Sequence, residues 1–219
     1  MNKKPHLIAF EGIDACGKFT QCSLLKKWLE EKGKKVGTWA EPNDASPIGK
    51  TIRDYLNKSS ALKIDVHEFQ RMFVIGRAQN IFSLFHDNRN SDEFKIADRF
   101  ALSTIAFGML SGRPADDFIK LHKDVLGPSM VWPDITFIID ISPETSVARI
   151  KTRTLGYKEG IFGAADRHEN YSVQEKVRKH YLEVANRKDI GKIVVLDGER
   201  APEEIFEDVK KAVAEHFGI

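Results

Sequence analysis

Residues 6–20 read HLIAFEGIDACGKFT, an apolar run that leads directly into the pattern G-x-x-x-x-G-K. A strand, a glycine-rich loop and a helix in this order form a phosphate-binding loop. The backbone N–H groups of such a loop and of the helix N-terminus can bind phosphate oxygens. We therefore predict that ATP phosphates bind to Gly12, Ile13, Asp14, Ala15, Cys16, Gly17, Lys18, Phe19 and Thr20.

Two positions in this loop bear on the chemistry. Lys18 is suited to neutralise charge on the β- and γ-phosphates. The next residue is normally Ser or Thr, whose hydroxyl holds Mg²⁺, but here it is Phe19. Thr20 is turned by roughly 100° around the helix, so it cannot simply replace that hydroxyl. Either Mg²⁺ is held by water and other groups, or catalysis is weakened or lost.

The rest of the chain alternates apolar runs with helical patterns. Runs typical of strands buried on both faces lie at His6–Glu11, Lys35–Ala40, Phe94–Asp98, Ile135–Ile141 and Ile193–Leu196. Helices are predicted at Lys18–Lys32, Ile48–Asn57, Val66–Phe85, Ala101–Leu110, Asp116–Val125, from Ser142 and Pro143 onward, Val173–Ala185 and Pro202–Phe217. This alternation predicts an α/β fold of three layers (α/β/α), with a five-stranded parallel sheet covered by helices on both faces.

Composition narrows the class of protein. A chain of 219 residues can bury a sizeable core, and we expect one domain over residues 1–219. The net charge of +2, without a basic cluster, gives no support for a nucleic-acid partner. The apolar run that ends at Glu11 is too short for a signal or membrane segment, so we expect no membrane association. Cys16 and Cys22 do not face each other on one helix, which favours buried, reduced thiols in a cytoplasmic protein.

Residues 152–170 differ from the rest of the chain. They contain three glycines together with charged residues that include Arg153 and Arg167. Their length and basic residues favour a short mobile lid between two helices over a plain surface loop.

Further short motifs extend the comparison along nearly the whole chain. They are Phe10-Glu11-Gly12-Ile13-Asp14, Gly17-Lys18-Phe19-Thr20-Gln21, Glu41-Pro42, Ile52-Arg53, Met72-Phe73-Val74-Ile75-Gly76-Arg77, Asp98-Arg99-Phe100, Pro133-Asp134 and Asp166-Arg167-His168-Glu169. In order and spacing they resemble the motifs of thymidylate kinases, which are nucleoside monophosphate kinases with a phosphate-binding loop. The chain departs from that pattern at Phe19, at Ala40 in place of Arg, and at Gly108, where many bacterial members have Gln.

The resemblance implies phosphorylation of dTMP to dTDP for dTTP biosynthesis, with ATP as co-substrate, Mg²⁺ as cofactor and a homodimer as the assembly. It implies catalytic roles for Lys18, Asp98, Arg99, Arg153 and Arg167. It implies dTMP contacts from Asp14, Glu41, Pro42, Arg53, Phe73, Arg77, Arg99, Ser103 and Phe107. Asp98 would hold Mg²⁺ directly or through water. Because Ala15 supplies no charge, the basic groups at the phosphates come from Arg149, Arg153 or Arg167, and we favour the last two.

The residue types suit these roles. Phe73 offers a flat surface on which thymine can stack, worth ~1–3 kcal/mol. Arg77 lies one turn further along the same helix face and can donate to thymine carbonyls. Arg99 follows a strand end, where ligands bind in open parallel sheets, and can pair with phosphate oxygens. The competing interpretations are core packing for Phe73 and Phe107, surface exposure for the arginines, and an Asp98–Arg99 ion pair.

Two other functions fit parts of the sequence. Ala40 and Gly108 alter the expected base pocket, which would suit a kinase for another deoxynucleoside monophosphate. Phe19 alone would suit a catalytically silent nucleotide-binding protein.

Overall fold

The sheet organises the molecule. The structure is a computed structural model that describes residues 4–57, 64–81, 93–154 and 166–219. Its five strands are all parallel, in the order β2 (Val36–Ala40), β3 (Phe94–Asp98), β1 (His6–Glu11), β4 (Ile135–Asp140) and β5 (Lys192–Asp197). Phe10 near the end of β1 pairs with Asp98 on one side and Phe137 on the other. The carboxyl ends of the strands therefore meet at one edge, and the predicted five-stranded parallel sheet is confirmed.

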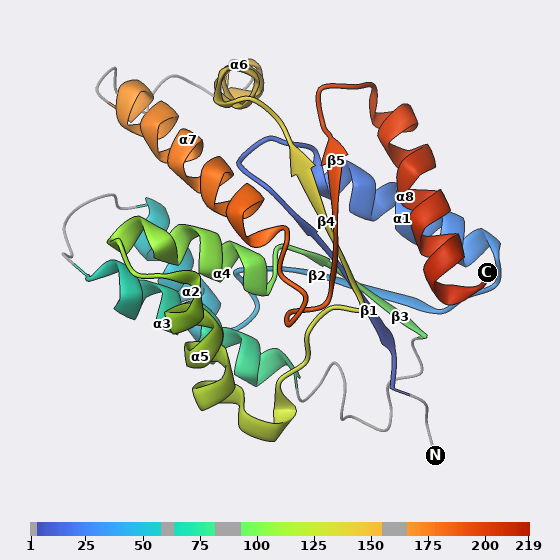
Figure 1. Ribbon diagram of the computed structural model, residues 1–219, viewed down its shortest axis with the longest axis horizontal. Helices are drawn as coiled ribbons and strands as arrows, with labels where there is room; N and C mark the ends of the chain where they lie inside the picture. Colours follow the sequence, from blue (N-terminus) through green and yellow to red (C-terminus); the bar gives the residue numbers. More distant parts are fainter. Residues whose placement is uncertain (1–3, 58–63, 82–92, 155–165) are drawn as a thin grey trace.

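Helices cover both faces of this sheet (Figure 1). One face carries α1 (Lys18–Glu31) and α8 (Pro202–Phe217), which pack on each other. The other carries α4 (Ala101–Gly108) and α7 (Asp166–Val184), with α3 (Val66–Ile81), α5 (Ala115–Leu126) and α2 (Pro47–Asn57) further out. Helix α6 (Pro143–Thr154) follows β4 and packs against α7. The predicted three layers are thus confirmed.

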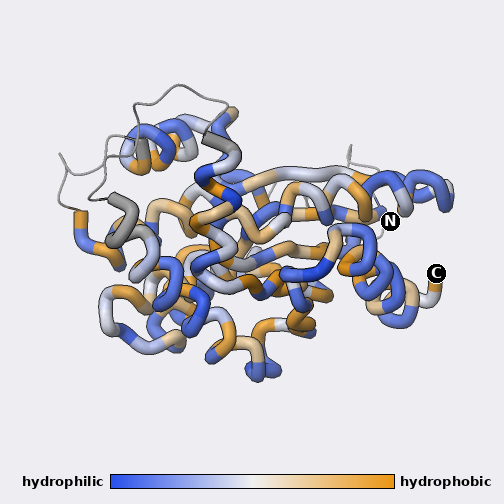
Figure 2. The backbone as a smooth tube through the Cα atoms, turned by 90° about the horizontal axis from the view of Figure 1, so that it is seen from above, coloured by the Kyte–Doolittle hydropathy of each residue, from blue (hydrophilic) through white to orange (hydrophobic). Residues whose placement is uncertain are grey.

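The central strands are buried because helices cover both faces. Residues Leu7, Ile8, Ala9 and Phe10 of β1 are all inaccessible to solvent, and the ring of Phe10 stacks on Phe137 of β4. A strand covered on both sides has no polar face, which explains the continuous apolar runs in the sequence. Figure 2 shows the same arrangement, with hydrophobic segments concentrated between helices whose outer turns are hydrophilic.

Several predicted boundaries were wrong. Helix α7 begins at Asp166 and not at Val173, and α6 runs to Thr154, so both ends of the segment 152–170 are helical rather than loop. Residues 155–165 of the predicted lid lie outside the described residues, as do 82–85 of the long third helix. The helix predicted to reach Leu110 ends at Gly108 and continues as a 3₁₀ turn, Met109–Ser111.

Other local predictions are confirmed. The hydroxyl of Ser142 accepts a hydrogen bond from the backbone N–H of Thr145 at 3.1 Å, as expected for a residue that caps α6. Cys16 and Cys22 are both buried and free. Within the described ranges, no helix has the length and apolar character needed to cross a membrane.

Candidate active site

The phosphate loop has the backbone that its glycines allow. Gly12 has a φ of 134°, and a Cβ there would lie 2.6 Å from the carbonyl oxygen of Ile139, so no other residue fits. Gly17 has a φ of 103° and directly precedes α1. The loop therefore leads the chain into the N-terminus of α1, where unpaired backbone N–H groups favour an anion.

Lys18 folds back over this loop. Its ammonium group donates to the carbonyl oxygens of Ile13 at 2.9 Å and Gly12 at 3.3 Å, and the residue is 7% exposed. These contacts hold the charge beside the loop that is predicted to bind phosphates. The neighbouring Phe19 is 76% exposed, so its ring takes little part in packing.

Asp14 links the loop to Arg99 and to α7. Arg99 Nη2 lies 2.5 Å from Asp14 Oδ1, and Gln174 donates to Asp14 Oδ2 at 2.8 Å. Gln174 also accepts the backbone N–H of Asp14 at 3.1 Å. Burial opposes ionisation of Asp14, but the charges of Arg99 and Lys18 and these hydrogen bonds outweigh it and lower its pKa. The carboxylate is therefore ionised at neutral pH.

Arg99 directly follows the carboxyl end of β3, and its side chain is held by several contacts. Its backbone has a φ of 69°, in the left-handed region, and such conformations in non-glycine residues cluster at functional sites. Its Nη1 donates to Gly12 O at 3.0 Å and to Ser103 Oγ at 3.1 Å, and the guanidinium lies over the ring of Phe107 at 5.6 Å. The charged partner of Arg99 is thus Asp14, and the alternative Asp98–Arg99 ion pair was wrong.

A buried carboxylate that the sequence analysis did not single out supports this arginine. Glu11, at the end of β1, is inaccessible to solvent and accepts the backbone N–H groups of Phe100 at 2.8 Å and Ser103 at 3.1 Å. Glu11 therefore accepts hydrogen bonds from backbone N–H groups at the N-terminus of α4 that have no partner within the helix. It also accepts the hydroxyls of Ser103 at 2.5 Å and Tyr181 at 3.1 Å. The available signal was a glutamate that ends an apolar strand just before the glycine loop.

Asp98 ends β3, half-buried, near the first turns of α1. Burial raises the pKa of Cys22 well above its usual value, and the nearby charge of Asp98 raises it further. Among the described residues, no three His, Cys, Asp or Glu side chains are grouped closely enough to hold a metal by themselves. Mg²⁺ in nucleotide sites usually binds one or two carboxylates together with phosphates and water. A single carboxylate beside the phosphate loop fits that requirement.

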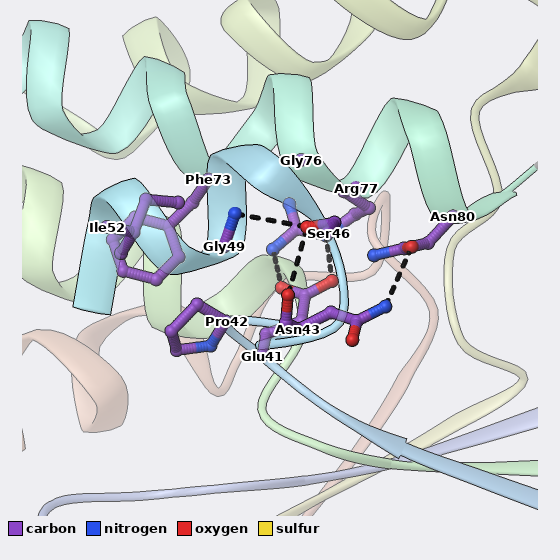
Figure 3. Close-up of a pocket in the computed structure, with 10 residues that line it drawn as sticks. All are labelled: Glu41, Pro42, Asn43, Ser46, Gly49, Ile52, Phe73, Gly76, Arg77 and Asn80. Atoms are coloured by element: carbon purple, nitrogen blue, oxygen red, sulfur yellow. Dashed lines mark hydrogen bonds and ion pairs between the residues drawn. The ribbon is translucent and has the colours of Figure 1, made fainter. Parts of the chain in front are cut away.

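A second pocket lies between the end of β2 and helices α2 and α3 (Figure 3). Four of the predicted dTMP contacts line it together: Glu41, Pro42, Phe73 and Arg77. The remaining lining residues are Asn43, Ser46, Gly49, Ile52, Gly76 and Asn80. Arg53 is not among them, since its guanidinium pairs with Asp44 at 3.1 Å on the exposed side of α2.

Arg77 forms the buried end of this pocket. The residue is 1% exposed, so the alternative of a solvated surface arginine was wrong. Its Nε donates to Glu41 Oε1 at 3.0 Å, and its Nη2 contacts Glu41 Oε2 and donates to Thr104 at 3.2 Å. Burial raises the pKa of Glu41, and the charge of Arg77 partly offsets this effect. Phe100 lies under the guanidinium at 4.6 Å.

Of Arg149, Arg153 and Arg167, the three candidates for charge at the phosphates, Arg149 has a described side chain, and it lies against the phosphate loop. Its Nη2 donates to Gly198 O at 3.1 Å and its Nη1 to Ala15 O at 3.5 Å, so it is not simply a solvated residue of α6. Arg153 and Arg167 lie near the ends of α6 and α7 that flank residues 155–165, and their side chains fall outside the described set.

Gly108 has no room for a side chain. A Cβ there would lie 2.4 Å from the ring of Phe118 on α5, so a glutamine at this position would require Phe118 to move. The ring of Phe118 therefore occupies the space that a side chain at position 108 would need.

The site combines a phosphate loop, an arginine at the adjacent strand end and a separate pocket with an aromatic ring and a buried arginine. Together with the parallel sheet, these features define the class of phosphate-loop nucleoside monophosphate kinases. Comparison with known proteins identifies the family.

A family model described as thymidylate kinase matches residues 10–209. The chain is 34% identical to the thymidylate kinase of Maridesulfovibrio salexigens, and the alignment covers 96% of the chain and 95% of that relative. It is 31% identical to the thymidylate kinase of Thermosipho africanus, with 96% and 98% covered. The chain belongs to the thymidylate kinase family.

Proposed function

We propose that this protein transfers the γ-phosphoryl group of ATP to dTMP, giving ADP and dTDP for dTTP synthesis. The observation that carries the proposal is the placement of Phe73 and Arg77 in one pocket at the sheet edge that also carries the phosphate loop and Arg99. Membership of the thymidylate kinase family supports it.

The pocket residues suit the acceptor nucleotide. The ring of Phe73 provides a surface for base stacking, and Arg77 provides donors for a base carbonyl oxygen. Arg99 binds the phosphate of the acceptor nucleotide. Its ion pair with the Asp14 carboxylate shows the same kind of contact with another anion. Asp14, held by Gln174, contacts the sugar between base and phosphate. Ser103 and Phe107 contribute by positioning Arg99, the first through a hydrogen bond and the second through its ring.

The phosphate loop suits the donor nucleotide. Its N–H groups bind the phosphates of ATP, and Lys18 neutralises the charge that moves toward the leaving ADP as the bridging bond breaks. An oxygen of the dTMP phosphate forms the new bond to the γ-phosphorus. Arg149 lies against the loop and is suited to the same charge, while Arg153 and Arg167 remain predicted partners.

Asp98 would hold Mg²⁺, directly or through water, since its half-buried carboxylate ends β3, the strand next to the one that leads into the phosphate loop. Bound there, the ion would withdraw negative charge from the transferred group.

A direct test is ADP release with ATP and Mg²⁺ across dTMP, dUMP, dCMP, dGMP, dAMP, UMP and AMP. We expect the highest kcat/KM with dTMP. A higher value with another deoxynucleotide would replace the proposed substrate, and a flat response would favour a silent nucleotide-binding protein.

Variants sharpen this test. Phe73→Leu and Arg77→Lys are each expected to raise the KM for dTMP about tenfold, because stacking or the guanidinium fork is lost. The KM for ATP should change little. Arg113→Ala is a matched control, since Arg113 makes an exposed ion pair with Asp117 on the outer side of α5. Equal effects on both substrates would argue against a base pocket here.

We propose further that residues 1–219 form one domain and that the protein is a cytoplasmic homodimer. The free, buried Cys16 and Cys22 suit a reducing compartment. Leu56 on α2 and Ile75 on α3 are large apolar residues that remain 48% and 37% exposed, which suits an interface involving these helices. Light scattering after size exclusion tests the dimer, and a monomer at micromolar concentration would contradict it.

A further inference from the structure

Nearly all donors of Arg77 already have partners. A guanidinium carries five N–H groups, one on Nε and two on each terminal nitrogen. The Nε group and both Nη2 groups are taken by Glu41 and Thr104. One Nη1 group is taken by Nε2 of His122, at 2.5 Å. Among the described residues, no partner is recorded for the second Nη1 group, so one donor of a fully buried side chain is left for a pocket ligand.

His122 is constrained to accept this hydrogen bond. It lies on α5, inaccessible to solvent, and its Nδ1 is 2.6 Å from the carbonyl oxygen of Phe118, one turn earlier. A carbonyl oxygen can only accept, so Nδ1 carries the proton. Burial, together with the charge of Arg77, lowers the pKa of His122 to about 3, so the ring is neutral. A neutral ring protonated on Nδ1 has an unprotonated Nε2, the atom that faces Arg77.

The charge balance of the cluster also calls for a neutral acceptor. Arg77 and Glu41 already form a buried pair with no net charge. A second carboxylate in place of His122 would leave an uncompensated buried charge, which is costly. An apolar side chain would leave a donor of Arg77 unpaired. The imidazole supplies an acceptor without charge and joins α5 to the pocket.

We propose that His122 is a positioning residue for base recognition: it holds one Nη1 donor of Arg77 and thereby presents the other to a carbonyl oxygen of the bound pyrimidine. This inference rests on the proposed use of the pocket by dTMP. It predicts selectivity for a base with a carbonyl group at that point over one with an amino group, since two donors cannot pair.

The test uses three substitutions at one position. His122→Phe keeps a ring but has no acceptor. His122→Gln can place an amide oxygen near the position of Nε2, whereas His122→Asn is too short to reach Arg77. Lys120→Ala, in an exposed pair with Asp124 on the same helix, is the control. The measurements are the Kd of dTMP by calorimetry without ATP, the KM of each substrate, kcat and the thermal midpoint.

We expect His122→Phe and His122→Asn to raise the Kd and KM for dTMP by about tenfold or more, the effect of losing a hydrogen bond to a charged group. The KM for ATP should stay within about twofold, and the preference for dTMP over dCMP should fall. His122→Gln should recover most of the affinity. If His122→Phe does not fold, the comparison of Gln with Asn carries the test.

Two outcomes would overturn the inference. One is a lower thermal midpoint with an unchanged Kd for dTMP, which indicates packing alone. The other is an equal loss of affinity in the Gln and Asn variants. A wild-type protein that binds no monophosphate would overturn the proposed function as well, whereas dTMP binding that is insensitive to position 122 would overturn this inference alone.

Discussion

At the scale of single residues, the buried pair of Arg77 and Glu41 is the feature with the largest consequence. Replacing Arg77 with Met would leave a buried carboxylate without its cation, and we expect the free energy of unfolding to fall by about 3–5 kcal/mol. Glu41→Gln in the same chain should relieve part of this cost, so that the double variant is less destabilised than the sum of the single ones. Urea denaturation without nucleotide measures each variant.

The exposed pair of Arg53 and Asp44 provides the matched control. Arg53→Met removes the same charge from an ion pair in water, where such pairs contribute about 0–1 kcal/mol. If Arg77→Met costs no more than Arg53→Met, the buried pair does not have the energetic role assigned to it.

His122 makes stability depend on pH in a defined direction. Its pKa is about 3 in the folded protein, below the ordinary value near 6.5 of an unfolded chain. Between these values the unfolded chain binds a proton that the folded protein does not. The contribution of His122 to the free energy of unfolding is therefore fully present above about pH 6.5 and decreases as the pH is lowered. Wild type should lose about 1.4 kcal/mol per pH unit relative to His122→Gln.

Urea denaturation of both proteins from pH 7.5 down to 4.5 measures this difference. Carboxylates whose pKa is lowered by folding, such as Asp14 and Glu199, are the same in both chains, so their effects cancel in the comparison. Parallel stability curves for the two proteins would show that His122 titrates normally.

Local sequence patterns carried only part of this information. The spacing of Phe73 and Arg77 placed both on one helix face, and both line the pocket. The burial of Arg77 was not predictable, because its partners come from the end of β2, from α4 and from α5. A single sequence does not reveal which distant acceptor a buried donor will meet.

At the scale of elements, α7 supplies two side chains that contact the phosphate site. Gln174 and Tyr181 lie two helical turns apart on one face, and they contact Asp14 and Glu11 respectively. Burial, with the charge of Glu11, raises the pKa of Tyr181 well above its usual value, so its hydroxyl keeps the proton that it donates.

Tyr181→Phe removes one donor from the buried Glu11 carboxylate. We expect the free energy of unfolding to fall by about 1–3 kcal/mol, the range for an unsatisfied buried polar group. The turnover number should also fall, since the hydroxyl lies 3.4 Å from Nη1 of Arg99. Lys176→Ala, at an exposed position of the same helix, is the control. Unchanged stability and rate in Tyr181→Phe would separate α7 from the phosphate site.

The element boundaries show where sequence reasoning reached its limit. Ser142 and Pro143 marked the start of α6 correctly, because capping chemistry is local. The start of α7 was placed seven residues late, at Val173 instead of Asp166, because glycines and mixed charges upstream suggested a loop. Acidic residues such as Asp166 are nonetheless favourable in a first helical turn.

At the scale of the whole molecule, the strand order brings Asp98 and the phosphate loop to neighbouring positions. Strands β3 and β1 are adjacent, so the carboxylate at the end of one lies beside the loop at the end of the other. The parallel sheet itself was predictable, since five apolar runs separated by helices leave few other arrangements. The position of Phe19 on the surface was not predictable, because an aromatic residue normally indicates burial.

Phe19→Ser would add the hydroxyl that phosphate loops usually offer to Mg²⁺. We expect the Mg²⁺ concentration for half-maximal rate to decrease, while stability changes by less than about 0.5 kcal/mol, because the ring is 76% exposed. Phe19→Ala removes the ring without adding a hydroxyl and serves as the control. If the Ser and Ala variants have the same Mg²⁺ dependence, the hydroxyl is not a metal ligand in this protein.

The cluster around Arg77 has a consequence for how the protein reaches its native state. Its members come from the segment after β2, from α3, α4 and α5, which span residues 41 to 122 of the chain. A folding intermediate that lacks the segment after β2, α4 or α5 would leave at least one donor of the guanidinium without its acceptor. During refolding, affinity for the base would therefore return only after all four of these segments have assembled. Binding of dTMP would then mark a late step of folding.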